Sequence, residues 1–178
     1  MQIKSKYPVL LIFLLCLIIN SGSLFSANVY YGFVDVNVQT QEMTLWCWAA
    51  SSQALILQRT GVFVAQSAIV EYVKGSVINA SGMPHEIKMA CDANGASVTY
   101  FWSIPNAPSI SSIISWIDSN KCFIVLRNNH ATVGFGYLIY YFSNFTTRWV
   151  AIDDPWYGKG KSWYSLENLQ SGWSATVR

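Results

Sequence analysis

Cys47 lies where a nucleophile would gain from its surroundings, at the start of a predicted helix. The stretch Leu45–Gln58 contains neither Gly nor Pro and holds three alanines, a composition that favours a helix. In the first turn of a helix, unpaired backbone N–H groups and the helix dipole favour thiolate over thiol. The alternative is that Cys47 is a small buried hydrophobe between Trp46 and Trp48. Other residues must decide between these two interpretations.

His130 is the histidine best placed to serve such a thiol as a base, and the sequence has only two histidines. It follows Asn128-Asn129 after one predicted strand and opens the next, so its ring can face a helix N-terminus across a cleft. There it could accept the thiol proton and later return it to a leaving amine. A turn histidine bonded to the backbone is the alternative. His85, on a short polar helix edge, is expected at the solvent-exposed surface.

An orienting carboxylate is available at the end of the predicted strand Trp149–Asp153. Pro155 stops this strand and holds the residue before it, Asp154, in an extended conformation. A carboxylate in this position would fix the tautomer of His130 and stabilise its imidazolium form. We favour Asp154 over Asp153 for the role, and an ordinary acidic turn is the alternative.

Gln41 could supply a hydrogen-bond donor to a developing oxyanion. It lies six residues before Cys47, from where its side-chain amide could join the Cys47 backbone N–H in an oxyanion hole. Loss of one such donor costs about 10²–10³ in rate. Gln39 is a rival for this position, and an isolated glutamine is more often a surface residue.

In this chain order the candidate residues resemble the active-site segments of papain-like cysteine peptidases. Gln41, followed after five residues by CWAA at 47–50, is similar to the nucleophile segment of that family. HATVGFGY at 130–137 resembles its histidine strand, and DPW at 154–156 resembles the motif that carries the third residue of its catalytic set. Smaller bacterial branches, including bacteriocin-leader peptidases and effector peptidases of plant pathogens, use Asp in that motif. The resemblance spans about 39–158, most of the chain that follows the leader.

The resemblance implies an α+β fold in which an N-terminal helical subdomain packs on a C-terminal antiparallel β-sheet subdomain. The cleft would run between them, with Cys47 on one wall, His130 and Asp154 on the other, and Gln41 beside the nucleophile. The implied activity is hydrolysis of peptide or isopeptide bonds in a protein or peptide substrate, through a thioester on Cys47 and without a cofactor. The alternatives are a secreted thiol amidase or transferase acting on cell-wall peptides, and a catalytically inactive papain-like binding module.

Two features separate this chain from plant-type papains. It is smaller and lacks their cysteine-rich, disulfide-supported pattern, so their subsite preferences do not carry over. Only residues 27–40 would precede Gln41 in the mature chain, too few for a folded inhibitory propeptide. We therefore expect control of activity to lie elsewhere, for example in a separate inhibitor or immunity protein.

The first residues have the pattern of a secretory signal peptide. Lys4 and Lys6 precede an unbroken apolar run, Val9–Ile19, after which the residues become small and polar. The run is shorter than the roughly 20 apolar residues that a membrane span needs, so no stable membrane anchor is expected. We predict a signal peptide at 1–26, one papain-like peptidase domain at 27–178, and a secreted or periplasmic protein.

The elements expected to position these residues change character along the chain. Helices are predicted at Leu45–Gln58 with Thr44 as N-cap, at Ala65–Lys74, at Pro84–Ala93, and along the stripe Ile110, Ile113, Ile114 and Ile117. Strands are predicted at Tyr30–Val38, Cys122–Leu126, Ala131–Tyr140, Trp149–Asp153, Ser162–Tyr164 and Trp173–Val177. Helices first and an antiparallel sheet second indicate an α+β domain.

Composition limits the classes of function. The chain has 178 residues, of which 52% are hydrophobic and 11% charged, which suits one folded domain and excludes a disordered chain. Two of the eleven Lys and Arg residues lie in the leader, and the nine that remain equal the nine Asp and Glu. Without a basic face, a nucleic-acid partner is not expected.

The mature chain would keep three cysteines. Cys91 and Cys122 could form a disulfide or remain buried thiols. Together with Cys47 and His130 they lack the close paired spacings of structural zinc sites, so no metal is expected. The many tryptophans and tyrosines could instead form a carbohydrate- or peptide-binding surface, although aromatic residues of small domains are more often part of the core.

Overall fold

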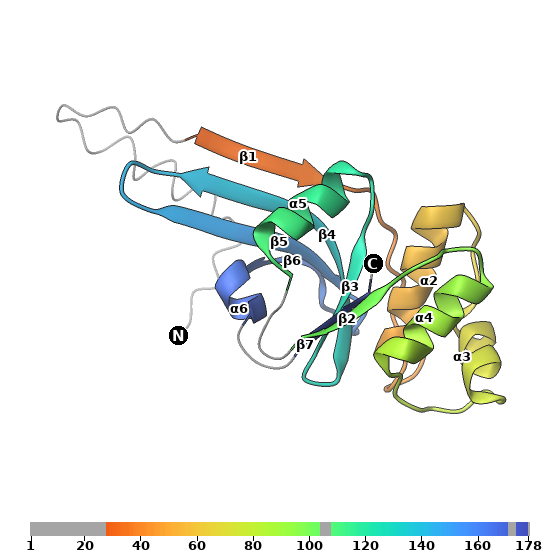
Figure 1. The fold of residues 1–178 in the computed structure, drawn as a ribbon. Coiled ribbons are helices and arrows are strands. Elements are labelled where there is room, and N and C mark those ends of the chain that lie inside the picture. The colour runs from red at the N-terminus through yellow and green to blue at the C-terminus, as the bar shows by residue number, and fades with distance from the viewer. Residues whose placement is uncertain (1–27, 104–107, 171–173, 178) are drawn as a thin grey trace, which may run out of the picture.

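The helices of residues 47–93 gather at one end of the molecule, and a twisted sheet extends from them into a long arm (Figure 1). The computed structural model describes residues 28–103, 108–170 and 174–177. The helices are α2 (Cys47–Thr60), α3 (Gln66–Lys74), α4 (Pro84–Ala93), α5 (Ile110–Asp118) and α6 (Leu166–Gln170). The strands are β1 (Asn28–Phe33), β2 (Tyr100–Ser103), β3 (Phe123–Arg127), β4 (His130–Tyr141), β5 (Thr146–Asp154), β6 (Gly160–Ser165) and β7 (Ser174–Val177). The predicted α+β class is confirmed.

The described strands pair antiparallel in the order β2-β7-β3-β4-β5-β6, and β1 pairs with the outer half of β4. On one edge, strand β4 pairs with β3 along its first residues and with β1 along its last, while β5 pairs along its other edge. A register shift between Gly134 and Gly136 marks the change of partner. A Cβ on Gly134 would lie 2.2 Å from the Phe123 ring, so that position has room only for glycine. This irregularity lets the start of β4 meet the helices while its end forms the arm.

Helix α2 is the central helix and carries Cys47 at its first residue. Its residues 47–56 are all buried, and it packs against β3, β4, α3 and α4. It ends at Gly61, whose left-handed backbone lets the Gly61 N–H bond the Leu57 carbonyl. The prediction that Thr44 caps this helix is wrong. Trp46 is the N-cap residue, and the Thr44 hydroxyl accepts a hydrogen bond from Asn79 Nδ2 at 2.8 Å instead.

The hairpin between β3 and β4 places His130. Its two connecting residues, Asn128 and Asn129, both have positive φ, 51° and 61°. A two-residue β-hairpin of this type requires the left-handed region at both positions, and asparagine tolerates it better than most residues. The turn pairs Arg127 with His130, so His130 becomes the first residue of β4.

The other predicted elements agree with the structure to different degrees. Helices α3, α4 and α5 are confirmed, and Ile113 and Ile117 face the core. The strand predicted at Tyr30–Val38 is wrong in its bounds, because after Phe33 the chain leaves the sheet edge and buries Val34 and Val36 on its way to the helices. The short elements β2 and α6 were not predicted. The expected signal peptide, and Trp173 at the start of the last strand, lie outside the described residues.

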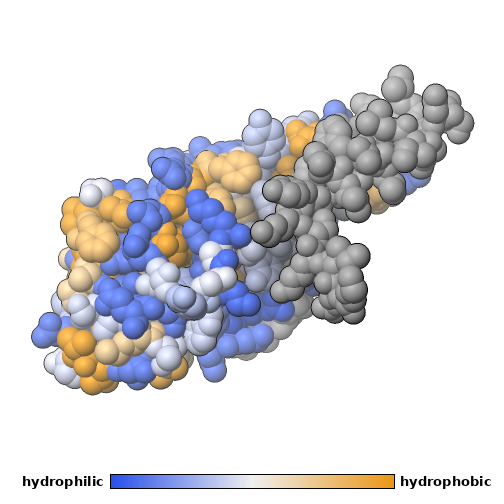
Figure 2. All heavy atoms as spheres, turned by 180° about the vertical axis from the view of Figure 1, so that it is seen from behind, coloured by the Kyte–Doolittle hydropathy of each residue, from blue (hydrophilic) through white to orange (hydrophobic). Residues whose placement is uncertain are grey.

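The three cysteines of the expected mature chain are all free and buried, so the pairing of Cys91 with Cys122 is not formed. Within the described residues, no helix is both long enough and apolar enough to cross a bilayer. On the face shown in Figure 2, apolar side chains form separate patches among hydrophilic ones.

The asparagine turn generates a stability prediction. Asn129→Val puts a β-branched side chain at a left-handed position and should lower the free energy of unfolding by about 1–2 kcal/mol. Asn129→Gly should leave it nearly unchanged, because glycine adopts positive φ without cost from a Cβ. Urea unfolding of both variants checks this. Equal stability of the two variants would show that the turn does not hold Asn129 in this conformation.

Candidate active site

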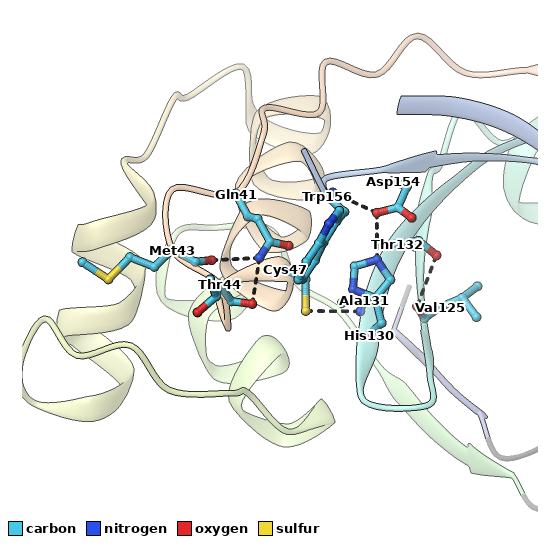
Figure 3. A network of polar contacts seen from close by, with 10 residues as sticks. All are labelled: Gln41, Met43, Thr44, Cys47, Val125, His130, Ala131, Thr132, Asp154 and Trp156. Atoms are coloured by element: carbon cyan, nitrogen blue, oxygen red, sulfur yellow. Dashed lines mark hydrogen bonds and ion pairs between the residues drawn. The ribbon is translucent and has the colours of Figure 1, made fainter. Parts of the chain in front are cut away.

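The Cys47 sulfur lies at the junction of the helical part and the sheet (Figure 3). Cys47 is 8% exposed, and its Sγ accepts a hydrogen bond from the backbone N–H of Ala131 at 3.4 Å. Ala131 is the second residue of β4, so the sulfur rests against the start of the strand that carries His130. The first turn of α2 has no side-chain cap. Its backbone N–H groups therefore remain a local source of positive potential beside the sulfur.

His130 links the thiol to a carboxylate. Its Nε2 is 2.7 Å from Asp154 Oδ1, and a second hydrogen bond joins the ring to Cys47. Because Nε2 is taken by Asp154, Nδ1 is the nitrogen that faces the sulfur. The hydrogen bond to Asp154 and then that to Cys47 raise the pKa of His130 to about 9, with burial opposing them. The imidazolium form is therefore the favoured one at neutral pH.

Asp154 is the carboxylate that meets His130. Burial alone would raise the pKa of Asp154, but hydrogen bonds from His130 and from the Trp156 backbone N–H hold it below its ordinary value. Its Oδ1 accepts both of these bonds, the second at 2.8 Å. Asp153 points to the opposite face of the sheet, where burial raises the pKa of its carboxyl and Lys161 opposes that shift. Of the two candidates, the geometry brings only Asp154 to the imidazole.

The Trp156 ring covers one side of this pair. It stands edge-on to the His130 ring at 6.0 Å between centroids, and Figure 3 shows it between Gln41 and the imidazole. An indole in this position limits the access of water to the His130–Asp154 hydrogen bond. A bond shielded in this way is stronger than one in bulk water.

Gln41 lies beside the nucleophile, but its amide is directed at its own loop. Nε2 donates to the carbonyls of Met43 and Thr44 at 2.8 and 2.9 Å. Because both acceptors are carbonyl oxygens, the amide nitrogen must be the atom that faces them. Oε1 is buried and has no hydrogen-bond partner among the described residues. The Gln41 backbone N–H donates to the Pro155 carbonyl at 2.9 Å, which ties this loop to the Asp154 segment.

The other glutamine and the other histidine lie away from this constellation. Gln39 donates to the side chain of Asn37 at 2.7 Å on the exposed surface. His85 is exposed on α4, as predicted. Over the described residues, no group of three or more His, Cys, Asp or Glu side chains is arranged to hold a metal ion.

Two cavities flank the His130–Asp154 pair. The first, of about 490 Å³, is lined by Thr44, Leu45, Cys47, Ser81, Asn128, Asn129, His130, Asp154, Trp156 and Lys159. The second, of about 350 Å³, continues beyond the imidazole over the sheet and is lined by Val125, Arg127, Asn128, His130, Thr132, Ile152, Asp154, Tyr164 and Leu169. Together they give a chain-like substrate room on both sides of the imidazole.

One wall of the first cavity depends on residues that sequence reasoning did not assign. The indole N–H groups of Trp46 and Trp48 donate to the carbonyls of Ile78 and Ala80 at 2.8 and 2.9 Å. Asn79 Oδ1 accepts from the Leu45 N–H at 2.9 Å. The two tryptophans on either side of Cys47 are the feature of the sequence that could have indicated these contacts. Their partners, more than thirty residues away, could not be identified from it.

The cysteines differ sharply in environment. Burial raises the pKa of Cys91 and of Cys122 to about 12, and both side chains are fully enclosed. Cys47 instead lines a cavity and contacts an imidazolium. Of the three, only Cys47 combines access to a cavity with an imidazole partner.

This fold is shared with papain-like peptidase domains of known structure. One is a double-glycine motif protease from an AMS/PCAT transporter, solved in complex with the leader peptide (TM-score 0.56, 19% identity, 82% of this chain and 91% of that one). A second is the peptidase domain of Streptococcus ComA, a bifunctional ABC transporter of a quorum-sensing pathway (TM-score 0.51, 18% identity, 83% and 96%). A third is UfSP from C. elegans (TM-score 0.53, 12% identity, 90% and 35%).

At these identities the likeness establishes the fold, and the resemblance to bacteriocin-leader peptidases is confirmed at that level. No protein-family model and no curated protein matches the sequence. The papain-like fold therefore rests on the three-dimensional comparison, and the short motifs around Cys47, His130 and Asp154 agree with it.

The raised pKa of His130 predicts how stability depends on pH. The pKa in the folded chain is about 9, against about 6.5 for an unperturbed histidine. A raised pKa contributes stability that is complete below about pH 6.5 and is lost as the pH rises through about 9. We expect His130→Gln to lower the free energy of unfolding most at about pH 6, with the difference from wild type shrinking toward about pH 9. Urea unfolding at both pH values measures it, and His85→Gln is the control.

Proposed function

We propose that this chain is a cysteine peptidase that hydrolyses peptide or isopeptide bonds through a thioester on Cys47. The observation that carries the proposal is the chain of hydrogen bonds from Cys47 through His130 to Asp154, set between two cavities. A papain-like fold shared with two peptidase domains supports it. A binding module without activity would have no need of an imidazole bonded to both a thiol and a carboxylate.

In the proposed mechanism, His130 holds the proton of Cys47, and the resulting thiolate attacks the substrate carbonyl carbon. The C–N bond breaks as the His130 imidazolium gives its proton to the leaving amine, which leaves an acyl group on the sulfur. His130 then takes a proton from a water molecule that attacks the thioester, and the carboxylic acid and free thiol are released. Asp154 keeps the ring oriented and stabilises its charged form in each step.

The developing oxyanion needs donors, and we assign two. The first is the backbone N–H of Cys47, at the uncapped start of α2. The second is the side-chain amide of Gln41, whose hydrogens bond the Met43 and Thr44 carbonyls in the unliganded chain. For Gln41 to act, one of these loop bonds has to be exchanged for a bond to the oxyanion when substrate binds.

The proposed substrate is a protein or peptide whose chain lies along the two cavities. One structural neighbour was solved with a leader peptide, which supports a peptide substrate here. The apolar leader at 1–26 supports action outside the cytoplasm, in a periplasm or after secretion. Control by a separate inhibitor or immunity protein remains part of this proposal.

Thiol labelling tests the nucleophile. Iodoacetamide should modify Cys47 at least tenfold faster than Cys91 or Cys122, because the last two thiols are enclosed and have pKa values of about 12. Peptide mass mapping over a time course of the native protein gives the three rates. Similar rates for all three cysteines would contradict the proposal, and His130→Gln should slow the modification of Cys47 only.

Paired substitutions test the orienting carboxylate. Asp154→Asn should lower kcat/KM by roughly 100-fold or more, because the neutral amide no longer stabilises the His130 imidazolium. Asp153→Asn, at the next residue but on the other face of the sheet, should leave kcat/KM within a few-fold of wild type. Cleavage of a fluorogenic peptide library measures both. The reverse pattern would transfer the role to Asp153.

A further inference from the structure

One face of the sheet arm is apolar and open to solvent. The arm consists of β1, the outer half of β4, β5 and β6 (Figure 1). In the register of the arm, Phe33 of β1 pairs with Gly136 of β4, which is aligned with Ala151 of β5 and Trp163 of β6. Tyr31 of β1 pairs with Leu138 of β4, which is aligned with Trp149 of β5. The aromatic face, as we call it, comprises Val29, Tyr31, Phe33, Trp149 and Trp163. These side chains are between 36% and 66% exposed.

The opposite face of the arm is covered along much of its length, although Tyr30 and Tyr141 near its outer end are 57% and 43% exposed. On the covered part, Tyr137 and Ile139 are 6% and 1% exposed, and the Tyr137 hydroxyl donates to Asp118 of α5 at 3.0 Å. Near the other end of the sheet, Leu169 of α6 and Tyr164 of β6 line the second cavity on that same covered face. Within the described part of the chain, α5 and α6 thus leave the aromatic face uncovered.

The rings of the aromatic face are held against one another. Gly136 lies beneath Phe33, and a Cβ at this position would come within 2.4 Å of the Phe33 ring. The missing side chain lets Phe33 meet Trp163 edge-to-face at 5.7 Å and Phe135 at 6.3 Å. A surface ordered in this way loses little conformational entropy when something binds to it.

The charges around this face favour one kind of partner. The acidic residues of the four strands are Asp153, which is 6% exposed, and Asp154, which belongs to the active-site cleft. Lys161 lies at the rim with its Nζ 5.0 Å over the Phe135 ring. Lys161 is aligned with Asp153 across β5 and β6, and Asp35, which is exposed, follows β1 where the chain turns toward the helices. Tyr, Trp and Phe side chains beside a lysine are typical of surfaces that settle at a membrane–water interface.

The position of the aromatic face in the chain also favours a membrane surface as its partner. Strand β1 begins at Asn28, nine residues after the apolar run Val9–Ile19. Nine extended residues span about 30 Å. If the apolar run inserts into a membrane during export, this linker length allows the aromatic face to contact the same membrane.

We propose that the aromatic face docks reversibly on the interfacial region of a lipid bilayer. Its rings would lie among the headgroups and upper acyl chains, and Lys161 would contact anionic headgroups. The inference goes beyond the peptidase proposal and does not depend on it, because neither Cys47 nor His130 belongs to this face.

Binding of the full chain to vesicles of phosphatidylcholine and phosphatidylglycerol tests the proposal. Tyr31→Glu combined with Trp163→Ser should weaken binding about tenfold, because it removes buried aromatic area and adds a like charge. The matched control is Tyr72→Glu with Phe63→Ser, at positions of α3 and of the loop before it that are 59% and 63% exposed, and it should bind as wild type does. Circular dichroism checks folding. If the double variant unfolds, Tyr31→Glu alone provides the test, because Tyr31 is 66% exposed.

A second measurement separates the face from the apolar run. Brominated lipids should quench part of the tryptophan emission, and Trp149→Phe with Trp163→Phe should remove that part while vesicle binding persists. Trp156→Phe, at an exposed cleft position, should leave the quenched part of the emission unchanged. Cys47→Ala should bind vesicles as wild type does, so a failure of the peptidase proposal would not affect this result.

Three outcomes would overturn the docking proposal. The first is that the wild-type chain does not bind vesicles. The second is that quenching is unchanged in the Trp149→Phe, Trp163→Phe variant, which would assign binding to the apolar run alone. The third is that the Tyr31→Glu, Trp163→Ser variant keeps vesicle binding but no longer cleaves a peptide substrate, which would make the face a peptide-binding surface.

Discussion

The hydrogen bond between His130 and Asp154 is the contact on which the rest of the site depends. It joins the first residue of β4 to the last residue of β5, so the geometry of the whole sheet fixes it. With Nε2 held by the carboxylate, the ring has one free nitrogen, and that nitrogen faces Cys47. The same bond raises the pKa of His130 and lowers that of Asp154, so the two groups stabilise each other's charge. Without it, the imidazole would be a half-buried ring with no fixed orientation.

The sulfur is positioned by the other half of the molecule. Indole hydrogen bonds from Trp46 and Trp48 fix the start of α2 against the chain at 78–80, and the bond from Gln41 to Pro155 joins the preceding loop to the Asp154 segment. Each such bond contributes only about 0.5–1.5 kcal/mol. Because they act from different directions, they nevertheless leave the start of α2 little freedom to move. The position of the sulfur at the junction of the two parts therefore rests on contacts made well outside the cavities.

The same residue types have different properties in different parts of this fold. Two cysteines are enclosed in the core and act as small hydrophobes, whereas the third borders a cavity beside an imidazolium. Aromatic residues are divided in a similar way, with Trp46 and Trp48 in the core and the aromatic face of the arm in solvent. Environment, rather than residue type, separates the structural members of each set from those available to a substrate or a surface.

The sequence by itself determined which elements form and which residue types could carry chemistry. The isoleucine stripe of α5, the Asn128-Asn129 turn and the order of Gln41, Cys47, His130 and Asp154 are local signals, because each depends on spacing along the chain. Only the tertiary structure decided that Asp154 rather than Asp153 meets the imidazole and that the Gln41 amide faces its own loop. It also decided that one face of the arm is left open. These outcomes depend on which face of a strand is covered and on partners dozens of residues away, and packing in three dimensions sets both.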